Sequence, residues 1–494
     1  MSKKKIVVIG AGISGLSAAC NLAFKGYEVT VLEKNNSIGG RARRYTEKGF
    51  VFDMGPSWYW MPDVFEEFFQ RLGRKREDYY QIERLDPSYR VFFKEGEVCD
   101  IPADINAYYD LFEKIEPGSS TALKKFLEEA EYKYSVGMKD LVYKPGLSLF
   151  EFADLRILKG ILKLDVFKSF YSHVRSYFKD PRLIQLLEFP VLFLGEIPKN
   201  TPALYSLMNH ADINLGTWYP VGGMYKIIEA FEKVALELGV KIVTNQDVET
   251  VIIKNDRIHE VKTKDSLFSA DMVVGSADYA HIDRNILPSH YRQYDNKYWD
   301  TRKLAPSCLI YYLGISKTLS GLLHHNLFFD QDFEQHADTI YTNPDWPKNP
   351  LFYVSVVSKT DQAAAPADHE NVFVLIPVAP GLQDSKEIRD QYYDLVMERM
   401  ENITKQNIKD FVVYKKTYAM QDFVNDYNAL KGNAYGLANT LLQTAILKPK
   451  IRNKKLKNLF YAGQLTVPGP GVPPGIISGQ VVADLIANDK KLNS

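Results

Sequence analysis

Three glycines near the N-terminus are spaced for binding a dinucleotide. Gly10, Gly12 and Gly15 follow the apolar run 5–9, and a second apolar run ends at Glu33. In this pattern the first glycine permits a tight turn, the second lets backbone approach a pyrophosphate, and the third allows a helix to pack closely on a strand. The Glu33 carboxylate would accept hydrogen bonds from ribose hydroxyls, which argues against a 2′-phosphate. The spacing predicts a strand–helix–strand unit whose helix N-terminus faces the phosphates.

The same segment also has the charge pattern of a secretory signal peptide. Lys3 to Lys5 precede an uncharged stretch that runs to Phe24. The apolar region of a signal peptide is a simple helix, whereas this stretch carries three glycines and is followed by a second strand with a terminal acid. We therefore favour the dinucleotide-binding unit.

Three further glycine-rich stretches extend the pattern over most of the chain. They are Gly39-Gly40-Arg41 with its continuation to Trp58, the turn at 219–224, and the proline- and glycine-rich stretch 459–479. These residues resemble the FAD-containing amine oxidase and phytoene desaturase superfamily, and the C-terminal stretch is similar to bacterial carotenoid desaturases. The resemblance implies FAD as the cofactor, with the Gly-Gly-Arg turn contacting its phosphates and flavin side, and the backbone of Val248 contacting the adenine.

The resemblance and the glycine spacing together give a set of expected cofactor-binding residues. One of them departs from the family pattern: Gln464 stands where many members carry an acid, and Gln can still donate and accept hydrogen bonds. The expected FAD-binding residues are Gly10, Gly12, Ile13, Ser14, Gly15, Glu33, Lys34, Gly40, Arg41, Gly55, Pro56, Ser57, Val248, Gly463, Gln464, Gly475 and Ile476.

The motifs lie far apart in the sequence yet serve one cofactor, so the domain that binds it must be assembled from separated segments. We expect an α/β fold in which a three-layer, Rossmann-like FAD/NAD(P)-binding domain carries an inserted mixed α+β substrate domain. The expected FAD-binding domain comprises 1–60, 218–280 and 448–494, and the substrate domain 61–217 and 281–447. Apolar periodicity predicts a helix through 227–238, strands at 240–244, 248–254, 258–263, 271–275 and 458–462, and a closing helix over 475–487.

The composition argues against several functions. Lys plus Arg equals Asp plus Glu at 61 each, and no basic stripe is present, so we expect no nucleic-acid partner. The three cysteines are far apart, which indicates neither disulfides nor a zinc site and favours a reducing compartment. His324, His325 and His336 have no carboxylates at ligand spacing. We expect a surface loop there, and no metal.

One segment has the pattern of a helix that lies on a membrane surface. Within 149–171, leucines and other apolar residues form a stripe and Lys159 and Lys163 are among the positive charges beside it. An ordinary amphipathic helix covering the substrate domain explains the pattern equally well. No other segment outside the glycine motif has the eighteen apolar residues that span a bilayer. We expect peripheral attachment to the cytoplasmic side of a membrane.

The implied reaction is desaturation of a C40 carotene, of the phytoene-to-lycopene type. Hydride would leave an allylic C–H for flavin N5, the cation would lose a proton to a base or water, and oxygen or a quinone would reoxidise the flavin. Trp58 and Trp60 are candidates for the wall of the substrate tunnel, although they could instead join the two domains. The helix N-terminus at Gly475 would stabilise negative charge on the flavin.

No catalytic acid or base is assigned from the sequence. Asp53, Glu196, Asp212 and His210 lie near recognisable turns, where such residues are more often caps or surface groups. Other functions on the same scaffold stay open: a hydroxycarotenoid or monocyclic carotene desaturase, a carotene isomerase, an amine oxidase, or an isoprenoid-binding escort protein without redox chemistry.

Overall fold

The computed structural model describes residues 3–148, 151, 165 and 168–493. At its centre is a five-stranded parallel sheet in the order β19-β13-β1-β2-β9. Its strands are buried along most of their length, as expected for a parallel sheet covered on both faces. They come from three separated segments, namely β1 (Lys5–Ile9), β2 (Glu28–Leu32), β9 (Lys241–Val243), β13 (Met272–Gly275) and β19 (Leu459–Tyr461).

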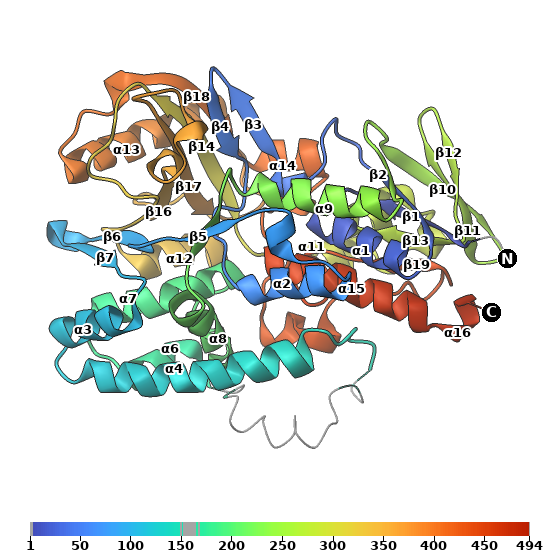
Figure 1. Ribbon diagram of the computed structural model, residues 1–494, viewed down its shortest axis with the longest axis horizontal. Helices are drawn as coiled ribbons and strands as arrows, with labels where there is room; N and C mark the ends of the chain where they lie inside the picture. The colour runs from blue at the N-terminus through green and yellow to red at the C-terminus, as the bar shows by residue number, and fades with distance from the viewer. Residues whose placement is uncertain (1–2, 149–150, 152–164, 166–167, 494) are drawn as a thin grey trace.

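Helices cover one face of this sheet and a small antiparallel sheet covers the other. Helices α1 (Ile13–Phe24), α9 (Tyr225–Glu237) and α15 (Val472–Asn488) share one core with β1 and β2. The opposite face packs on β10 (Val248–Lys254) and β11 (Arg257–Thr263), which pair with β12 (Leu267–Ser269). The expected three-layer α/β arrangement is confirmed, and the termini lie together at its outer end (Figure 1).

Glycines permit the close approach of α1 to its neighbours. A Cβ on Gly15 would lie 2.0 Å from the backbone oxygen of Gly10, and a Cβ on Gly479 would lie 2.6 Å from the backbone nitrogen of Ala18. Side chains at these positions would push α1 away from β1 or from α15. The predicted packing role of Gly15 is thus confirmed.

A seven-stranded mixed sheet forms the second half of the molecule (Figure 1). Its order is β18-β14-β17-β16-β15-β6-β7, and only the pair β6–β15 is parallel. One face packs on α13 (Lys386–Thr404) to form a separate apolar core. The strands are β6 (Tyr89–Phe93), β7 (Val98–Ile101), β14 (Ser307–Ile315), β15 (His325–Phe329), β16 (Phe352–Ser355), β17 (Glu370–Val378) and β18 (Val412–Tyr418).

Helices lie beneath this sheet in the view of Figure 1. They are α3 (Ile105–Ile115), α4 (Ser119–Val136), α6 (Phe170–Arg175), α7 (Pro181–Glu188) and α8 (Leu207–Asn209). The other elements are α2 (Pro62–Arg71), α10 (Tyr279–His281), α11 (Asn296–Asp300), α12 (Phe333–Tyr341), α14 (Met420–Tyr427), α16 (Lys490–Asn493), the hairpin β3 (Arg44–Glu47) with β4 (Phe50–Asp53), and the pair β5 (Ile82–Arg84) with β8 (Trp218–Pro220).

Most of the 149–171 segment, including Lys159 and Lys163, lies outside the described residues, so the predicted membrane helix stays a prediction. In the part of the chain that is described, no helix combines the length and the apolar character needed to cross a bilayer. The proposed division into two domains likewise stays a prediction.

Two local predictions are wrong. The three histidines expected in a surface loop are buried: His324 immediately precedes β15, His325 is its first residue, and His336 lies in α12. The pairing of β15 places His324 and His325 in the interior, and α12 places His336 there. Their rings pack against other side chains. The closing helix begins at Val472, three residues earlier than Gly475, because prolines fit the first turn of a helix, where no N–H bond is lost.

Candidate active site

One cavity of about 480 Å³ runs between the two halves of the molecule. It is lined from all three segments that build the parallel sheet and from the seven-stranded sheet. Every expected cofactor-binding residue lines it except Gly15 and Ile476. These two lie just behind the lining, where the Ser17 hydroxyl donates a hydrogen bond of 2.7 Å to the Ile476 carbonyl.

The first end of the cavity, which we call the nucleotide end, is organised around Glu33. This buried carboxylate follows β2 and accepts hydrogen bonds of 2.9 Å from the backbone nitrogens of Ala11 and Asn35. The Asn35 side chain donates a third, also of 2.9 Å. These bonds hold the carboxylate at the cavity wall, where a ribose would bind, with Val248 of β10 lining the same end.

Two helix N-termini open onto the cavity. The N-cap residues of α1 and α15 are Gly12 and Gly471, and neither helix has a side-chain cap. The first-turn N–H groups of α1 are therefore available to an anion, which the helix dipoles also attract. In α15 only the Val472 N–H is available, because Pro473 and Pro474 have no N–H and the Gly475 N–H donates to the Gly471 carbonyl. A Cβ on Gly12 would meet no atom within 4 Å, whereas one on Gly40 would lie 3.2 Å from the Gly12 Cα. This open, glycine-lined cradle fits a pyrophosphate.

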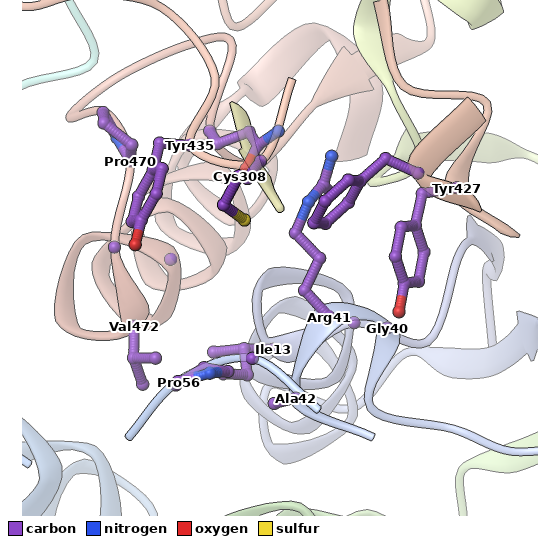
Figure 2. Close-up of a pocket in the computed structure, with 18 of the residues that line it drawn as sticks. Ile13, Gly40, Arg41, Ala42, Pro56, Cys308, Tyr427, Tyr435, Pro470 and Val472 are labelled. Carbon is purple, nitrogen blue, oxygen red and sulfur yellow. The ribbon is translucent and has the colours of Figure 1, made fainter. Parts of the chain in front are cut away.

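Arg41 brings a buried positive charge to the same region. One of its terminal nitrogens donates to the Asn433 carbonyl at 3.2 Å, and its guanidinium lies 5.0 Å from the centre of the Tyr427 ring (Figure 2). Its Nε has no hydrogen-bond partner. Burial lowers the pKa of Arg41, and the nearby Asp278 acts against this. An uncompensated buried N–H beside the glycine cradle is what an anionic cofactor would satisfy.

The C-terminal stretch shapes the wall opposite Arg41, where Figure 2 shows Pro470 and Val472. The Ser478 hydroxyl accepts a hydrogen bond of 2.9 Å from the Gly463 nitrogen and donates one of 2.7 Å to the Val467 carbonyl, which ties the loop to α15. Gln464, the departure from the family pattern, donates to the Asn433 side chain at 3.2 Å. In this chain the amide therefore binds the protein itself.

The other end of the cavity, which we call the apolar arm, is lined mainly by hydrophobic and aromatic side chains. Trp58 and Trp60 are both in its wall, as the tunnel-wall prediction requires, with ring centres 5.1 Å apart. The Trp58 ring also stacks on His325, at 4.1 Å between centres and 12° between planes. Other lining residues of the arm are Phe189, Ile310, Leu327, Phe329, Phe333, Ile340, Leu351, Phe352, Leu375 and Pro377.

The buried carboxylate of Asp212 belongs to a hydrogen-bond network that contacts both tryptophans. The Trp60 Nε1–H donates to the Thr217 hydroxyl at 2.8 Å, and that hydroxyl donates to Asp212 at 3.4 Å. Tyr89, whose ring lies edge-on to Trp58, donates to the other Asp212 oxygen at 3.0 Å. Burial raises the pKa of Asp212 to about 7. The network fixes the orientation of both rings.

None of the four polar residues near turns lines the cavity. Asp53 accepts hydrogen bonds from the backbone nitrogens of Met224 and Tyr225 and so caps α9. Glu196 is buried in an ion pair with Lys303, and His210 packs against the Tyr134 ring. Three tyrosines that the sequence did not single out, Tyr341, Tyr353 and Tyr435, also line the cavity. The only available signal was the high tyrosine content, which does not distinguish one tyrosine from another.

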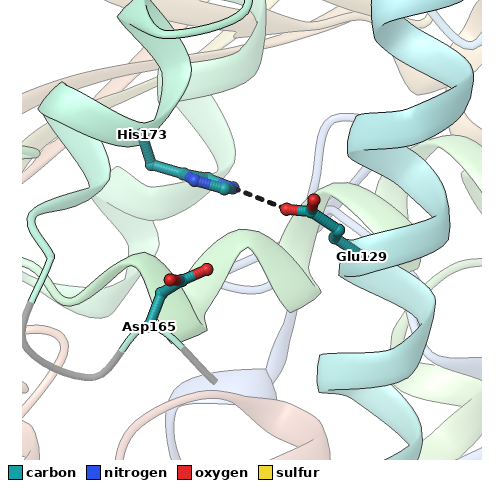
Figure 3. A group of neighbouring side chains, drawn as sticks. All are labelled: Glu129, Asp165 and His173. Carbon is teal, nitrogen blue, oxygen red and sulfur yellow. Dashed lines mark ion pairs between the residues drawn. The ribbon is translucent and has the colours of Figure 1, made fainter. Parts of the chain in front are cut away.

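A group of acidic and histidine side chains lies outside the cavity, on the helical layer (Figure 3). It comprises Glu129, Asp165 and His173. The Lys133 ammonium, which is buried, lies 2.9 Å from an Asp165 oxygen, and the Tyr177 hydroxyl donates to Glu129 at 2.7 Å. Burial and the nearby lysines lower the pKa of His173 to about 3. Asp165 is thus paired with a protein cation and Glu129 with a hydroxyl, and no metal role follows from the group.

Comparison with known proteins shows which family the chain belongs to. Residues 13–487 match the family model described as flavin-containing amine oxidoreductase. The chain belongs to that family. It is 42% identical over 490 residues to a carotenoid 3,4-desaturase of Haloarcula japonica, with 99% of each chain covered. It is 31% identical to a ζ-carotene-forming phytoene desaturase of Myxococcus xanthus, covering 97% of this chain and 93% of the relative.

These relatives identify the chain as a flavin-dependent oxidoreductase of the carotenoid desaturase family. Among solved structures, an oxidoreductase from Methanosarcina mazei is similar, with a TM-score of 0.62, 19% identity, and 97% of this chain and 100% of that chain covered. At this identity the likeness supports the fold alone. The recognition made from the glycine motifs is confirmed.

Proposed function

We propose that this protein is an FAD-dependent desaturase of C40 carotenoids. The observation that carries the proposal is the continuity of one cavity, in which a nucleotide end with open helix N-termini joins an arm lined by apolar and aromatic side chains. The relatives named above act, by their names, on carotenoids. A dinucleotide with a redox-active ring and a long hydrocarbon would meet where the two ends join.

The residues of the nucleotide end fit FAD. Glu33 would bind the ribose, Gly12 and the first turn of α1 the pyrophosphate, and Arg41 an anionic edge of the cofactor. Gly55, Pro56 and Ser57 would then lie beside the flavin. A bound flavin accepts the hydride, with its two electrons, that amino-acid side chains cannot take up.

The protein's own contribution is to position the substrate and exclude water. The positive dipole end of α15, with its one free N–H at Val472, would stabilise negative charge that develops on the ring system. The aromatic wall keeps the arm dry and holds the carbon chain against the cofactor. Each buried methylene contributes roughly 0.8 kcal/mol, so a hydrocarbon binds tightly without a polar group and is selected by the length and shape of the arm.

Two carotenoid reactions fit this cavity. The sequence motifs favour desaturation of the phytoene-to-lycopene type, whereas the 42% identity favours desaturation at the 3,4 bond, the reaction in the relative's name. An amine oxidase is the weaker alternative. Of the described residues that line the cavity, the only lysine is Lys34, at the nucleotide end, so none faces the arm. We further propose peripheral membrane attachment, on the cytoplasmic side, and reoxidation by oxygen or a quinone.

A substrate comparison tests the function. The purified protein is reconstituted with FAD and incubated in liposomes with phytoene, ζ-carotene, lycopene or monocyclic γ-carotene, with and without a quinone. We expect the absorption of one substrate to shift to longer wavelength as conjugation extends. A phytoene shift supports the first reaction and a lycopene shift the second. If the protein takes up no flavin, or changes no carotenoid while oxidising an amine, the proposal fails.

The assignment of Trp58 and Trp60 to the wall of the apolar arm has its own test. Trp58→Ala and Trp60→Ala open the arm beside the cofactor, so we expect lower turnover and an altered mixture of products while the protein stays yellow. Unchanged rate and products in both variants would contradict the assignment.

A further inference from the structure

Desaturation needs a proton acceptor, and the glycine motifs do not supply one. Once a hydride has left an allylic carbon, the remaining carbocation becomes an alkene only when a neighbouring C–H gives up its proton. In an apolar arm that keeps water out, the acceptor has to be a side chain. This inference rests on the proposed function and concerns the second half of that reaction.

Among the described residues that line the cavity, His336, Tyr341 and Tyr353 lie in the apolar arm, and Cys308 and Tyr435 lie near Arg41 and Pro470 (Figure 2). Tyr418 also lines the cavity, but its hydroxyl donates at 2.8 Å to Asp426, whose carbonyl accepts from Asn35 at the nucleotide end. Both ring nitrogens of His336 are engaged, because Nδ1 accepts the Leu351 N–H at 3.0 Å and Nε2 donates to the Pro377 carbonyl at 2.9 Å. Burial raises the pKa of the Cys308 thiol, so no thiolate forms. A neutral tyrosine can accept a proton only if its own proton can pass to a base.

Tyr353 has such a base behind it. Its hydroxyl lies 2.6 Å from Nδ1 of His325, a fully buried residue. No hydrogen bond to a histidine or carboxylate is found for Tyr341 or Tyr435 in the described part of the chain. Leu327 pairs directly with Tyr353, and side chains alternate along a strand, so His325 shares a face with Leu327 and lies diagonally across from Tyr353.

The imidazole of His325 is neutral, so one of its ring nitrogens has a lone pair that can accept a proton. Burial lowers the pKa of His325 well below its ordinary value. We assign the Tyr353 O–H as donor to Nδ1, which leaves the His325 proton on Nε2, an atom with no hydrogen-bond partner. Such an orphaned buried group calls for an explanation. The Trp58 ring stacked on His325 would stabilise the imidazolium that forms.

We propose that Tyr353 is the catalytic proton acceptor and that His325 acts through it. The C–H bond next to the cation breaks, its electron pair becomes the new π bond, and its proton goes to the Tyr353 oxygen. In the same step the Tyr353 hydroxyl proton passes to Nδ1 of His325. Tyr353 ends neutral, His325 ends as the imidazolium, and the two electrons of the oxidation have left with the hydride. The low pKa of His325 favours release of that proton before the next cycle.

Two variants test the relay. Tyr353→Phe removes the hydroxyl, and His325→Asn keeps an acceptor near the Nδ1 position but removes the base. General acid–base catalysis contributes about 10²–10⁴-fold, so we expect each variant to lower kcat by about 100-fold or more with little change in KM. A primary isotope effect should appear at the carbon that loses the proton, because proton loss becomes rate-limiting. The double variant should be no slower than the slower single variant.

Controls separate this role from a structural one. Tyr311→Phe makes the same change in β14 of the same sheet, where the hydroxyl donates to the Arg389 carbonyl away from the cavity, and should leave kcat unchanged. Nitrogen-15 NMR of histidine-labelled protein, without substrate, should show the Nε2–H tautomer of His325 and a shift of its Nδ1 signal in Tyr353→Phe. Flavin content should be unchanged in both relay variants.

Each negative result has one meaning. If wild-type protein binds FAD but converts no carotenoid, the proposed function fails and the relay with it. If wild-type protein is active and either variant turns over at the wild-type rate without the isotope effect, the relay alone is overturned. If Tyr353→Phe does not fold, His325→Asn still decides the question.

Discussion

The two ends of the cavity are built in different ways. At the nucleotide end the contacts come from backbone N–H groups, glycines and one buried carboxylate, all held within short motifs such as 10–15 and 33–35. In the apolar arm the contacts come from side chains that are hundreds of residues apart, such as Trp58 and His325. The first design depends on local backbone geometry, so few substitutions are tolerated. The second depends on packing, so its shape can change while the fold is kept.

The largest expected effect on function is at Gly15, where a side chain should abolish flavin binding altogether. A valine there would place its Cβ 2.0 Å from the Gly10 oxygen, so α1 must move off β1. Overpacking typically costs about 1–3 kcal/mol, and the displaced helix would also lose the pyrophosphate cradle. We expect Gly15→Val to be colourless and to melt at a lower temperature. The checks are flavin absorption and thermal unfolding.

Gly12→Ala is the matched control. Its Cβ would meet no protein atom within 4 Å, so the fold should keep its melting temperature while the methyl group takes up cofactor space. Equal flavin binding in both variants and wild type would contradict the separate roles of Gly15 in helix packing and of Gly12 in pyrophosphate binding.

The next effect concerns the pH dependence of stability and is expected at Lys448, a buried residue next to Gly469 of the C-terminal loop. Burial lowers the pKa of Lys448 to about 7, and its nitrogen donates to Asn439 at 2.8 Å. Between about pH 7 and 10.5 the unfolded chain holds a proton that the folded one lacks, so stability should rise with pH across this range. Lys448→Met should remove that slope, by on the order of 4–5 kcal/mol. Denaturant unfolding at a series of pH values measures it, and an unchanged slope would show that Lys448 stays charged.

Asp212, behind the arm, should give a slope of the opposite sign. Its pKa of about 7 in the folded protein lies above the ordinary value of 3.8, so the folded chain holds a proton that the unfolded one has lost. Stability should therefore fall as pH rises from about 4 to 7, by on the order of 4 kcal/mol, and should then level off. Asp212→Asn should remove this dependence. The same unfolding series checks it, and a persistent fall would assign the slope to another buried acid, such as Asp53.

The smallest effect is expected at Glu33, where the charge is removed and the size of the side chain is kept. Glu33→Gln leaves an oxygen to accept the Ala11 N–H, but its NH₂ group replaces the oxygen that accepts from Asn35, so those hydrogen bonds are lost. The difference of about 1–1.5 kcal/mol corresponds to roughly tenfold weaker FAD binding with an unchanged fold. Flavin fluorescence titration measures the affinity. An unchanged affinity would mean that the carboxylate orients the loop and does not bind the ribose.

Much of the nucleotide end could be predicted from sequence because its determinants are local. A glycine at a tight turn or a close helix contact indicates its own backbone requirement, and so the strand–helix–strand unit was predicted and all but two of the predicted residues line the cavity. Lining residues outside the glycine motifs, such as Gln246, Asp278 and Tyr427, were not predicted. Helix and strand positions in 218–280 followed from apolar periodicity. The start of α15 was missed by three residues because proline was interpreted as a loop residue when it also fits the first helical turn.

What the sequence by itself determined is the α/β fold, the flavoprotein family and the nucleotide end. Only the tertiary structure decided the apolar arm. His325 faces Trp58 and Tyr353 because β15 pairs with β16 in one register, and a shift by one residue would turn both contacts to the other face. Register is set by burial over the whole sheet, a global quantity that no short motif carries. For that reason His324 and His325, interpreted as a surface loop from sequence, lie in the interior of the molecule, and His336 is buried there with α12.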